Sequence, residues 1–312
     1  MAYVNAGSNN AVTLDAVYKT LTIDSSTAAS TVADLTSSGI TSFTVTGDKK
    51  LTLTDWSLSN TALAITSTNT AGVTLGTTAL GTAQTFAGGD GADTITVGAT
   101  TKAITTGAGN DTVTTGSALG TGGSVDAGAG TDTLSMTAAN AVTASGTGTF
   151  EATISNFETL KTGVMAAATS INLANLDDIN AISSAGDGAI TARTMTVTNA
   201  QEAFSLTLTA ASHADAEHNI SFVDSSGASD SMALTLSATI NSAMGDVIAN
   251  AVETISINSD DTSLVSLSTH SVTLTANALK TLTVTGDAAL TLTNASTTLT
   301  SVDFSGNGKG VA

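Results

Sequence analysis

Three nine-residue segments between Gly88 and Ser135 share one pattern and constrain the fold more than any other part of the sequence. In each, glycine at positions 2 and 4 and aspartate at position 6 precede an apolar residue at position 8. The segments are residues 88–96 (GGDGADTIT), 106–114 (TGAGNDTVT) and 127–135 (AGAGTDTLS). Repeats of this length and pattern are typical of a parallel β-roll, in which a glycine-rich turn leads into a short strand.

The spacing of the segments predicts how they stack. The first two begin 18 residues apart, and the third begins 21 residues after the second. Because two nonapeptides complete one coil of a roll, we expect all three segments to lie on one edge. Their apolar residues, Ile95, Val113 and Leu134, should then point inward. The longer second step predicts a three-residue insertion within residues 116–123, which are rich in glycine.

The opposite edge of the first coil, residues 97–105, departs from the pattern. Ile104 keeps the inward apolar position, but Lys102 stands where the aspartate would be. Because an ammonium group repels a cation, we predict a one-sided roll with two gaps between turns, both on the edge that carries the aspartates.

The residue types in the turns indicate calcium chemistry. Ca²⁺ takes about six to eight oxygen ligands from carboxylates and backbone carbonyls, and glycine allows the positive φ that turns carbonyls inward. Asp93, Asp111 and Asp132 would supply the charge, with Asp90 and Asn110 as auxiliary donors. The predicted site residues are Gly89, Asp90, Gly91, Asp93, Gly107, Gly109, Asn110, Asp111, Gly128, Gly130 and Asp132. Glycine and aspartate also make ordinary turns, but three such motifs in register favour Ca²⁺.

The composition favours a narrow core built from small side chains. The 312 residues are 41% hydrophobic but only 3% aromatic and 11% charged, without proline or cysteine. Apolar residues alternate with threonine in short segments such as Leu206-Thr207-Leu208, which is the pattern of strands with one buried face. Residues 17–54 recur as residues 252–293, including TVTGD followed by LTLT in both copies. We predict an all-β, right-handed parallel β-solenoid (β-helix) that contains the short roll.

The expected organisation has five parts. An N-terminal arm covers residues 1–16, solenoid coils cover 17–87, and the roll covers 88–135. Further coils cover 136–304, with a polar insertion near 212–230, and a tail covers 305–312. Helical turns are expected at residues 27–35 and 175–182, with a turn or loop at 212–218. Less than a fifth of the chain should be helical.

The charge and the termini limit the partners and the location. A net charge of −18 argues against binding to nucleic acid or to an anionic membrane surface. Residues 1–15 lack the basic and apolar parts of a signal peptide, and no stretch is apolar enough to insert in a membrane. We expect export without a cleaved signal peptide and a place at the cell surface. A cytoplasmic location and a fragment of a longer chain are the alternatives.

Other acidic and histidine residues favour plainer interpretations. His213, Asp215, Glu217 and His218 are close in sequence, but their spacing favours an exposed loop over a metal site. Several aspartates in turns are candidates for further calcium sites, although a turn role is favoured: Asp48, Asp224, Asp230, Asp260, Asp261 and Asp287. Asp187 lies between two glycines, without a second group to complete a site.

Catalytic groups are scarce. The sequence shows no pair of carboxylates placed for glycoside hydrolysis, no nucleophile motif and a single arginine, Arg193. We therefore predict that the protein is not an enzyme. Threonine pairs that could bind ice or sugar are expected to be scattered over many strands, at no common position in the coil.

Residues 86–133 resemble a known family. The run FAGGDGADTITVGATTKAITTGAGNDTVTTGSALGTGGSVDAGAGTDT is similar to the RTX-type S-layer proteins of Gram-negative bacteria, closest to the Caulobacter type. The resemblance implies a right-handed β-solenoid with structural Ca²⁺ ions, self-assembly into a surface lattice and type I secretion. It also implies attachment to lipopolysaccharide through an N-terminal domain, which nothing in this chain resembles.

These observations together predict a calcium-dependent extracellular structural protein that self-assembles into an S-layer lattice or a related surface filament. Its partners would be further copies of the chain and a cell-surface glycan or lipopolysaccharide. The alternative is a glycan-binding or ice-binding module of a secreted RTX adhesin.

Overall fold

The computed structural model describes residues 2–5, 9–227, 229–263 and 268–312. The protein is all-β, with 47% of residues in strands and 4% in helices, and its parallel strands form a β-solenoid of about 13 turns. The predicted fold class is therefore confirmed, as is the low helix content. Two compact units make up the chain: Met1–Ser135 with Thr149–Glu158 (unit 1), and Met136–Gly148 with Thr159–Ala312 (unit 2).

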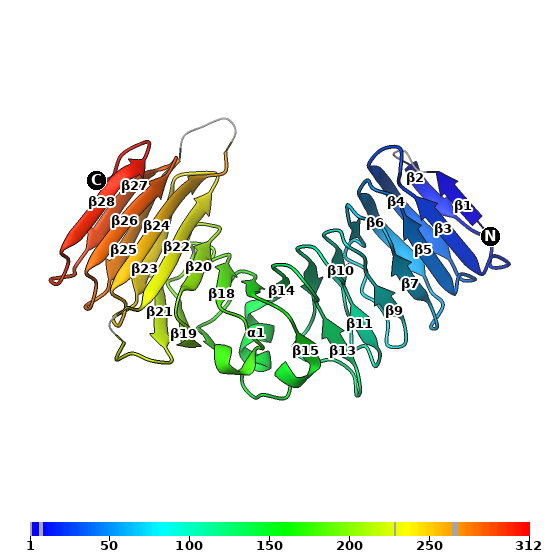
Figure 1. The fold of residues 1–312 in the computed structure, drawn as a ribbon, viewed down its shortest axis with the longest axis horizontal. Coiled ribbons are helices and arrows are strands. Elements are labelled where there is room, and N and C mark those ends of the chain that lie inside the picture. Colours follow the sequence, from blue (N-terminus) through cyan, green and yellow to red (C-terminus); the bar gives the residue numbers. More distant parts are fainter. Residues whose placement is uncertain (1, 6–8, 228, 264–267) are drawn as a thin grey trace. The chain divides into compact units, whose positions relative to one another are not determined.

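Unit 1 stacks its strands in two parallel sheets, and successive strands alternate between them (Figure 1). One sheet contains β1 (Ala2–Asn5), β3 (Thr20–Asp24), β5 (Ser42–Thr46), β7 (Ala64–Ser67), β9 (Thr85–Ala87), β11 (Ala103–Thr105), β13 (Ser124–Asp126) and β15 (Ile154–Ser155). The other contains β2 (Asn9–Thr13), β4 (Ser30–Ser37), β6 (Leu51–Leu58), β8 (Val73–Thr74), β10 (Thr94–Thr96), β12 (Thr112–Thr114) and β14 (Thr133–Met136). The 3₁₀ helix η1 (Glu151–Thr153) precedes β15.

Unit 2 repeats this arrangement with longer strands. One sheet runs through β16 (Thr159–Thr162), β18 (Ala181–Ser184), β20 (Phe204–Leu208), β22 (Ser231–Ala238), β24 (Thr254–Asp261), β26 (Thr281–Gly286) and β28 (Ser301–Asn307). The other runs through β17 (Thr169–Asn172), β19 (Thr194–Ala200), β21 (Glu217–Phe222), β23 (Ser242–Ile248), β25 (Thr269–Thr275) and β27 (Ala289–Asn294). The helices of this unit are α1 (Ala138–Ala144) and the 3₁₀ helix η2 (Leu173–Asn175).

The core consists of apolar columns that run from coil to coil. In unit 1, Leu21, Phe43, Ile65 and Phe86 are partners in register on β3, β5, β7 and β9, and each is at most 1% exposed. Strand alternation places one face of every strand in this core, and each coil therefore needs its neighbours to cover it. This is why a sequence poor in large side chains can still build a dry interior.

Several local predictions were wrong. Residues 27–35 are not helical, because Ser30–Ser37 form β4 and alternate buried and outward side chains. Residues 175–182 hold only the end of η2 and the start of β18. The unexpected helix is α1, which Thr137 caps by accepting a hydrogen bond from the Asn140 amide. It buries Ala138, Ala141 and Ala144, side chains small enough to lie close against a sheet.

The ends of the chain and the polar segment also differ from expectation. The arm expected at residues 1–16 contains β1 and β2, which pair with β3 and β4. The tail expected from residue 305 includes the last residues of β28, and Val311 bridges to Leu290. The polar insertion near 212–230 contains β21, which is part of a regular coil.

Candidate metal centre

The three nonapeptides stack in register, as the spacing predicted. Thr94, Thr112 and Thr133 are successive partners on β10, β12 and β14, and Ile95, Val113 and Leu134 are fully buried beneath them. On the opposite edge, Ile104 of β11 pairs with Val125 of β13, 21 residues further on. The three extra residues therefore lie between β12 and β13, where the insertion was predicted. Ile104 is buried and Lys102 is exposed.

The position-6 aspartates form a ladder along the edge of the roll. Asp93, Asp111 and Asp132 are each at most 1% exposed. The Oδ1 atom of each accepts a hydrogen bond from an amide of the preceding coil: from Val73 to Asp93 at 2.7 Å, from Asp93 to Asp111 at 2.7 Å and from Asp111 to Asp132 at 2.6 Å. Each carboxylate thus holds the turn beside it by a charge-assisted hydrogen bond.

Glu158 continues the ladder and was missed in the sequence. Its Oε2 atom accepts a hydrogen bond from the Asp132 amide at 2.6 Å. A signal was present, because Glu158-Thr159-Leu160 repeats Asp132-Thr133-Leu134 with glutamate for aspartate. The glycines of the nonapeptide are absent there, and a search for the full pattern passes over it.

The second carboxylate oxygens are the unusual feature of the ladder. Oδ2 of Asp93, Asp111 and Asp132 is buried and has no hydrogen-bond partner. A buried polar atom without a partner costs free energy, and native proteins seldom tolerate one. Three of them in one column indicate a binding partner for oxygen that the protein itself does not supply.

Electrostatics indicate the same. Burial raises the pKa of Asp93 to about 7, and the nearby charge of Asp111 acts in the same direction. Burial raises the pKa of Asp132 to about 6, with contributions from Asp111, Glu158 and Asp126. The pKa of Asp111 is also raised, mainly by burial. A divalent cation would relieve both the repulsion and the desolvation of these groups.

The glycines let the second and third turns approach closely. Gly107 and Gly128 have φ of 102° and 91°, and a Cβ at Gly128 would overlap the Gly107 carbonyl oxygen. The Gly107 oxygen accepts a hydrogen bond from the Ala129 amide at 2.8 Å. Gly109 and Gly130 also have positive φ, as predicted for position 4.

The first turn departs from the prediction, because neither Gly89 nor Gly91 has positive φ. The coil that precedes it carries no nonapeptide: Asn69 closes that turn with its side chain, and Gly72 supplies the left-handed residue. Gly91 packs against the Gly72 amide, which leaves no room for a side chain.

The two auxiliary residues have different positions. Asn110 accepts a hydrogen bond from the Thr131 amide of the next coil at 3.0 Å, and it therefore joins two turns. Asp90 is exposed. Across the described parts of the chain, no three carboxylate, imidazole or thiolate side chains surround one point. A cation in the roll would therefore take one carboxylate from each of two coils and complete its shell with other oxygens.

The remaining candidates are more dispersed. His213 and Asp215 are exposed at a turn, with Nδ1 and Oδ2 3.7 Å apart. His218 was expected in the same loop, but it is fully buried on β21, and burial lowers its pKa to about 4. Asp48 forms an exposed ion pair with Lys49 at 2.9 Å. Asp287 accepts a hydrogen bond from the Asp261 amide.

The sequence was also compared with known proteins. No family model matches the chain, and no curated protein matches it. The fold is that of a parallel β-solenoid, consistent with an RTX-type β-roll protein. No helix in the described residues is both long and apolar enough to cross a membrane.

Proposed function

We propose that this RTX-type β-solenoid is a calcium-dependent extracellular structural protein that self-assembles into an S-layer lattice or a related surface filament. The observation that carries the calcium part is the column of three buried, unpartnered Oδ2 atoms on Asp93, Asp111 and Asp132. Two stacked gaps on this edge would each hold one ion. Calcium would then serve as the staple that disulfides provide in other secreted proteins.

Assembly is supported by the form of the molecule and by the family resemblance. A solenoid buries its apolar columns only between neighbouring coils, and its terminal coils and strand edges offer surfaces to another chain. Val302 and Phe304 on β28 are 46% and 40% exposed, although the β26 residues on the neighbouring strand are buried. Further copies of the chain are the proposed partners, with a surface glycan or lipopolysaccharide as the attachment.

Electron microscopy of the purified chain tests this proposal. In millimolar Ca²⁺ we expect ordered sheets or filaments, and after chelation we expect dispersed particles. Dispersed particles in both conditions would reject self-assembly, and the same assemblies in both conditions would reject its dependence on calcium.

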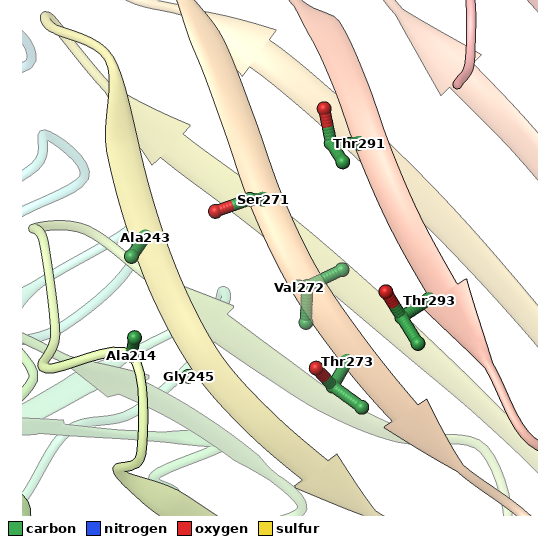
Figure 2. Close-up of a pocket in the computed structure, with 8 residues that line it drawn as sticks. All are labelled: Ala214, Ala243, Gly245, Ser271, Val272, Thr273, Thr291 and Thr293. Atoms are coloured by element: carbon green, nitrogen blue, oxygen red, sulfur yellow. The ribbon is translucent and has the colours of Figure 1, made fainter.

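A second candidate function, glycan or ice binding, is favoured by one observation. Hydroxyl-bearing side chains, expected to be scattered, lie in register on the outer faces of unit 2. Thr207, Thr235, Asn258 and Thr285 are successive partners on four strands. Figure 2 shows a second grid, in which Ser271 and Thr273 of β25 lie beside Thr291 and Thr293 of β27. Such rows repeat about every 4.8 Å across the strands, and a repeating solid or polymer could match that spacing.

This second candidate predicts inhibition of ice growth or retention on an insoluble polysaccharide. Lysine at Thr273 and Thr293 should abolish either activity, because it disrupts the grid without reaching the core. The matched control is Thr44→Lys on β5 in unit 1. Wild-type protein without either activity would reject this candidate and leave the structural role.

A further inference from the structure

A second group of carboxylates surrounds a cavity in unit 2, far along the chain from the roll. The cavity has a volume of about 290 Å³ and is lined by Glu202, Asp224 and Asp230, together with Phe222 and neighbouring backbone. Glu202 lies in the loop between β19 and β20, Asp224 follows β21, and Asp230 immediately precedes β22. The three carboxylates therefore come from three separate segments of the chain.

Asp230 is the buried member of this group. Its side chain is 1% exposed, and its Oδ2 atom has no hydrogen-bond partner. Glu202 and Asp224 are exposed. Among the described residues, no basic side chain forms an ion pair with Asp230. The nearest cationic group serves Glu253 instead, since Lys280 Nζ lies 3.9 Å from Glu253 Oε1.

The next coil reproduces the hydrogen bond of the roll. The Asp230 amide donates to Glu253 Oε2 at 3.1 Å, as the Asp111 amide donates to Asp132 Oδ1. Glu253 is 8% exposed. Two buried carboxylates thus lie on adjacent coils, one neutralised by Lys280 and the other left with an unpartnered oxygen at the cavity.

The charges around Asp230 disfavour its bare carboxylate. Burial raises its pKa, and the charges of Glu253, Glu202 and Asp224 raise it further. Either a proton or a cation must offset this cost. A cation is favoured by the cavity, because one water fills about 30 Å³ and there is room for an ion with several of its waters. Retained waters also remove the need for three carboxylates at ligand distance from one point.

We propose that a Ca²⁺ ion with part of its hydration shell binds in this cavity, with Asp230 as its inner ligand and with Glu202 and Asp224 completing the site. Oxygen ligands and partial hydration suit a hard divalent cation. The site would tie the turn before β22 to the loop before β20, which are joined in the described structure only by strand pairing. It does not depend on ion binding in the roll.

The test counts bound calcium in the full chain after equilibrium dialysis against millimolar Ca²⁺, with metal measured by mass spectrometry. Asp230→Asn keeps the shape of the side chain and removes its charge, and it should bind one ion fewer than wild type. Asp303→Asn, at an exposed position on β28, removes the same charge elsewhere and should bind the wild-type number. An unchanged count in Asp230→Asn would overturn the proposal and indicate a protonated Asp230.

Two further variants separate this site from the roll and from misfolding. Asp111→Asn should lose ions of the roll and keep the ion at Asp230. If Asp230→Asn does not fold, Glu202→Gln, an exposed change, should still weaken one calcium-binding step by roughly threefold or more through loss of ligand charge. Wild-type affinity at every step in Glu202→Gln would also overturn the proposal.

Discussion

Removing calcium with EGTA near pH 8 is expected to lower the melting temperature of unit 1 by about 10–20 °C. Each ion bound at 100 times its dissociation constant stabilises the folded state by about 2.7 kcal/mol. Two ions in the roll would contribute about 5 kcal/mol, and 1 kcal/mol corresponds to about 2–4 °C in a unit of this size. Scanning calorimetry with and without EGTA measures the shift.

The size of this effect should depend on pH. In the chelated protein, Asp93 and Asp132 have pKa values of about 7 and about 6, above their ordinary value of 3.8. Between these limits the folded state binds more protons than the unfolded state, and its stability therefore falls as pH rises. We expect chelated protein to melt about 4–8 °C higher at pH 5 than at pH 8, for a difference of about 2 kcal/mol. With Ca²⁺ bound, this difference should shrink.

Magnesium provides the control for these measurements. It prefers a compact octahedral shell and keeps its waters, so it should restore little of the lost stability in the roll. Equal melting temperatures with Ca²⁺ and with EGTA would contradict the role of calcium as a staple. A chelated protein that gains stability between pH 5 and pH 8 would contradict the raised carboxylate pKa values.

The second large effect is expected from Asp111→Ala compared with Asp93→Ala. In the hydrogen-bond ladder the two residues are equivalent, because each accepts an amide from the coil before and donates its own amide to the coil after. They differ only toward cations: Asp111 borders both gaps between nonapeptides, whereas Asp93 borders one. With Ca²⁺, Asp111→Ala should therefore cost more, by about 2–3 kcal/mol for the second ion.

This comparison contains its own control. In EGTA the two alanine variants should melt at similar temperatures, since only the hydrogen-bond ladder is then lost. Asp111→Asn retains an oxygen acceptor for the Asp93 amide and should differ from wild type mainly in the presence of Ca²⁺. Equal penalties for the two alanine variants with calcium present would contradict two stacked sites that share Asp111.

The roll could be predicted from the sequence because its signals are local and repeated. Three glycine–aspartate turns at nearly constant spacing fix the register, the inward column of Ile95, Val113 and Leu134, and the position of the insertion. The backbone of the first turn could not be predicted this way. It depends on the coil before it, where Gly72 and Asn69 make a different turn.

Features outside the roll were harder to predict because coil lengths vary. The strand-to-strand steps in unit 2 range from Thr159–Ala181 to Ser205–Ala233, and rows of hydroxyl groups that are in register in space are irregular in sequence. His218 shows the same limit, because its charged sequence neighbours indicate a loop while strand alternation buries it. Helix α1 has few sequence signals beyond Thr137, and its alanines are favoured by packing rather than by a hydrophobic period.

Anomalous diffraction from crystals grown with Ca²⁺ tests the central claim most directly. The account predicts a calcium peak beside the Oδ2 atoms of Asp93 and Asp111 and a second beside those of Asp111 and Asp132, with none beside Lys102. A well-ordered roll in millimolar Ca²⁺ without a calcium peak at either position would contradict it.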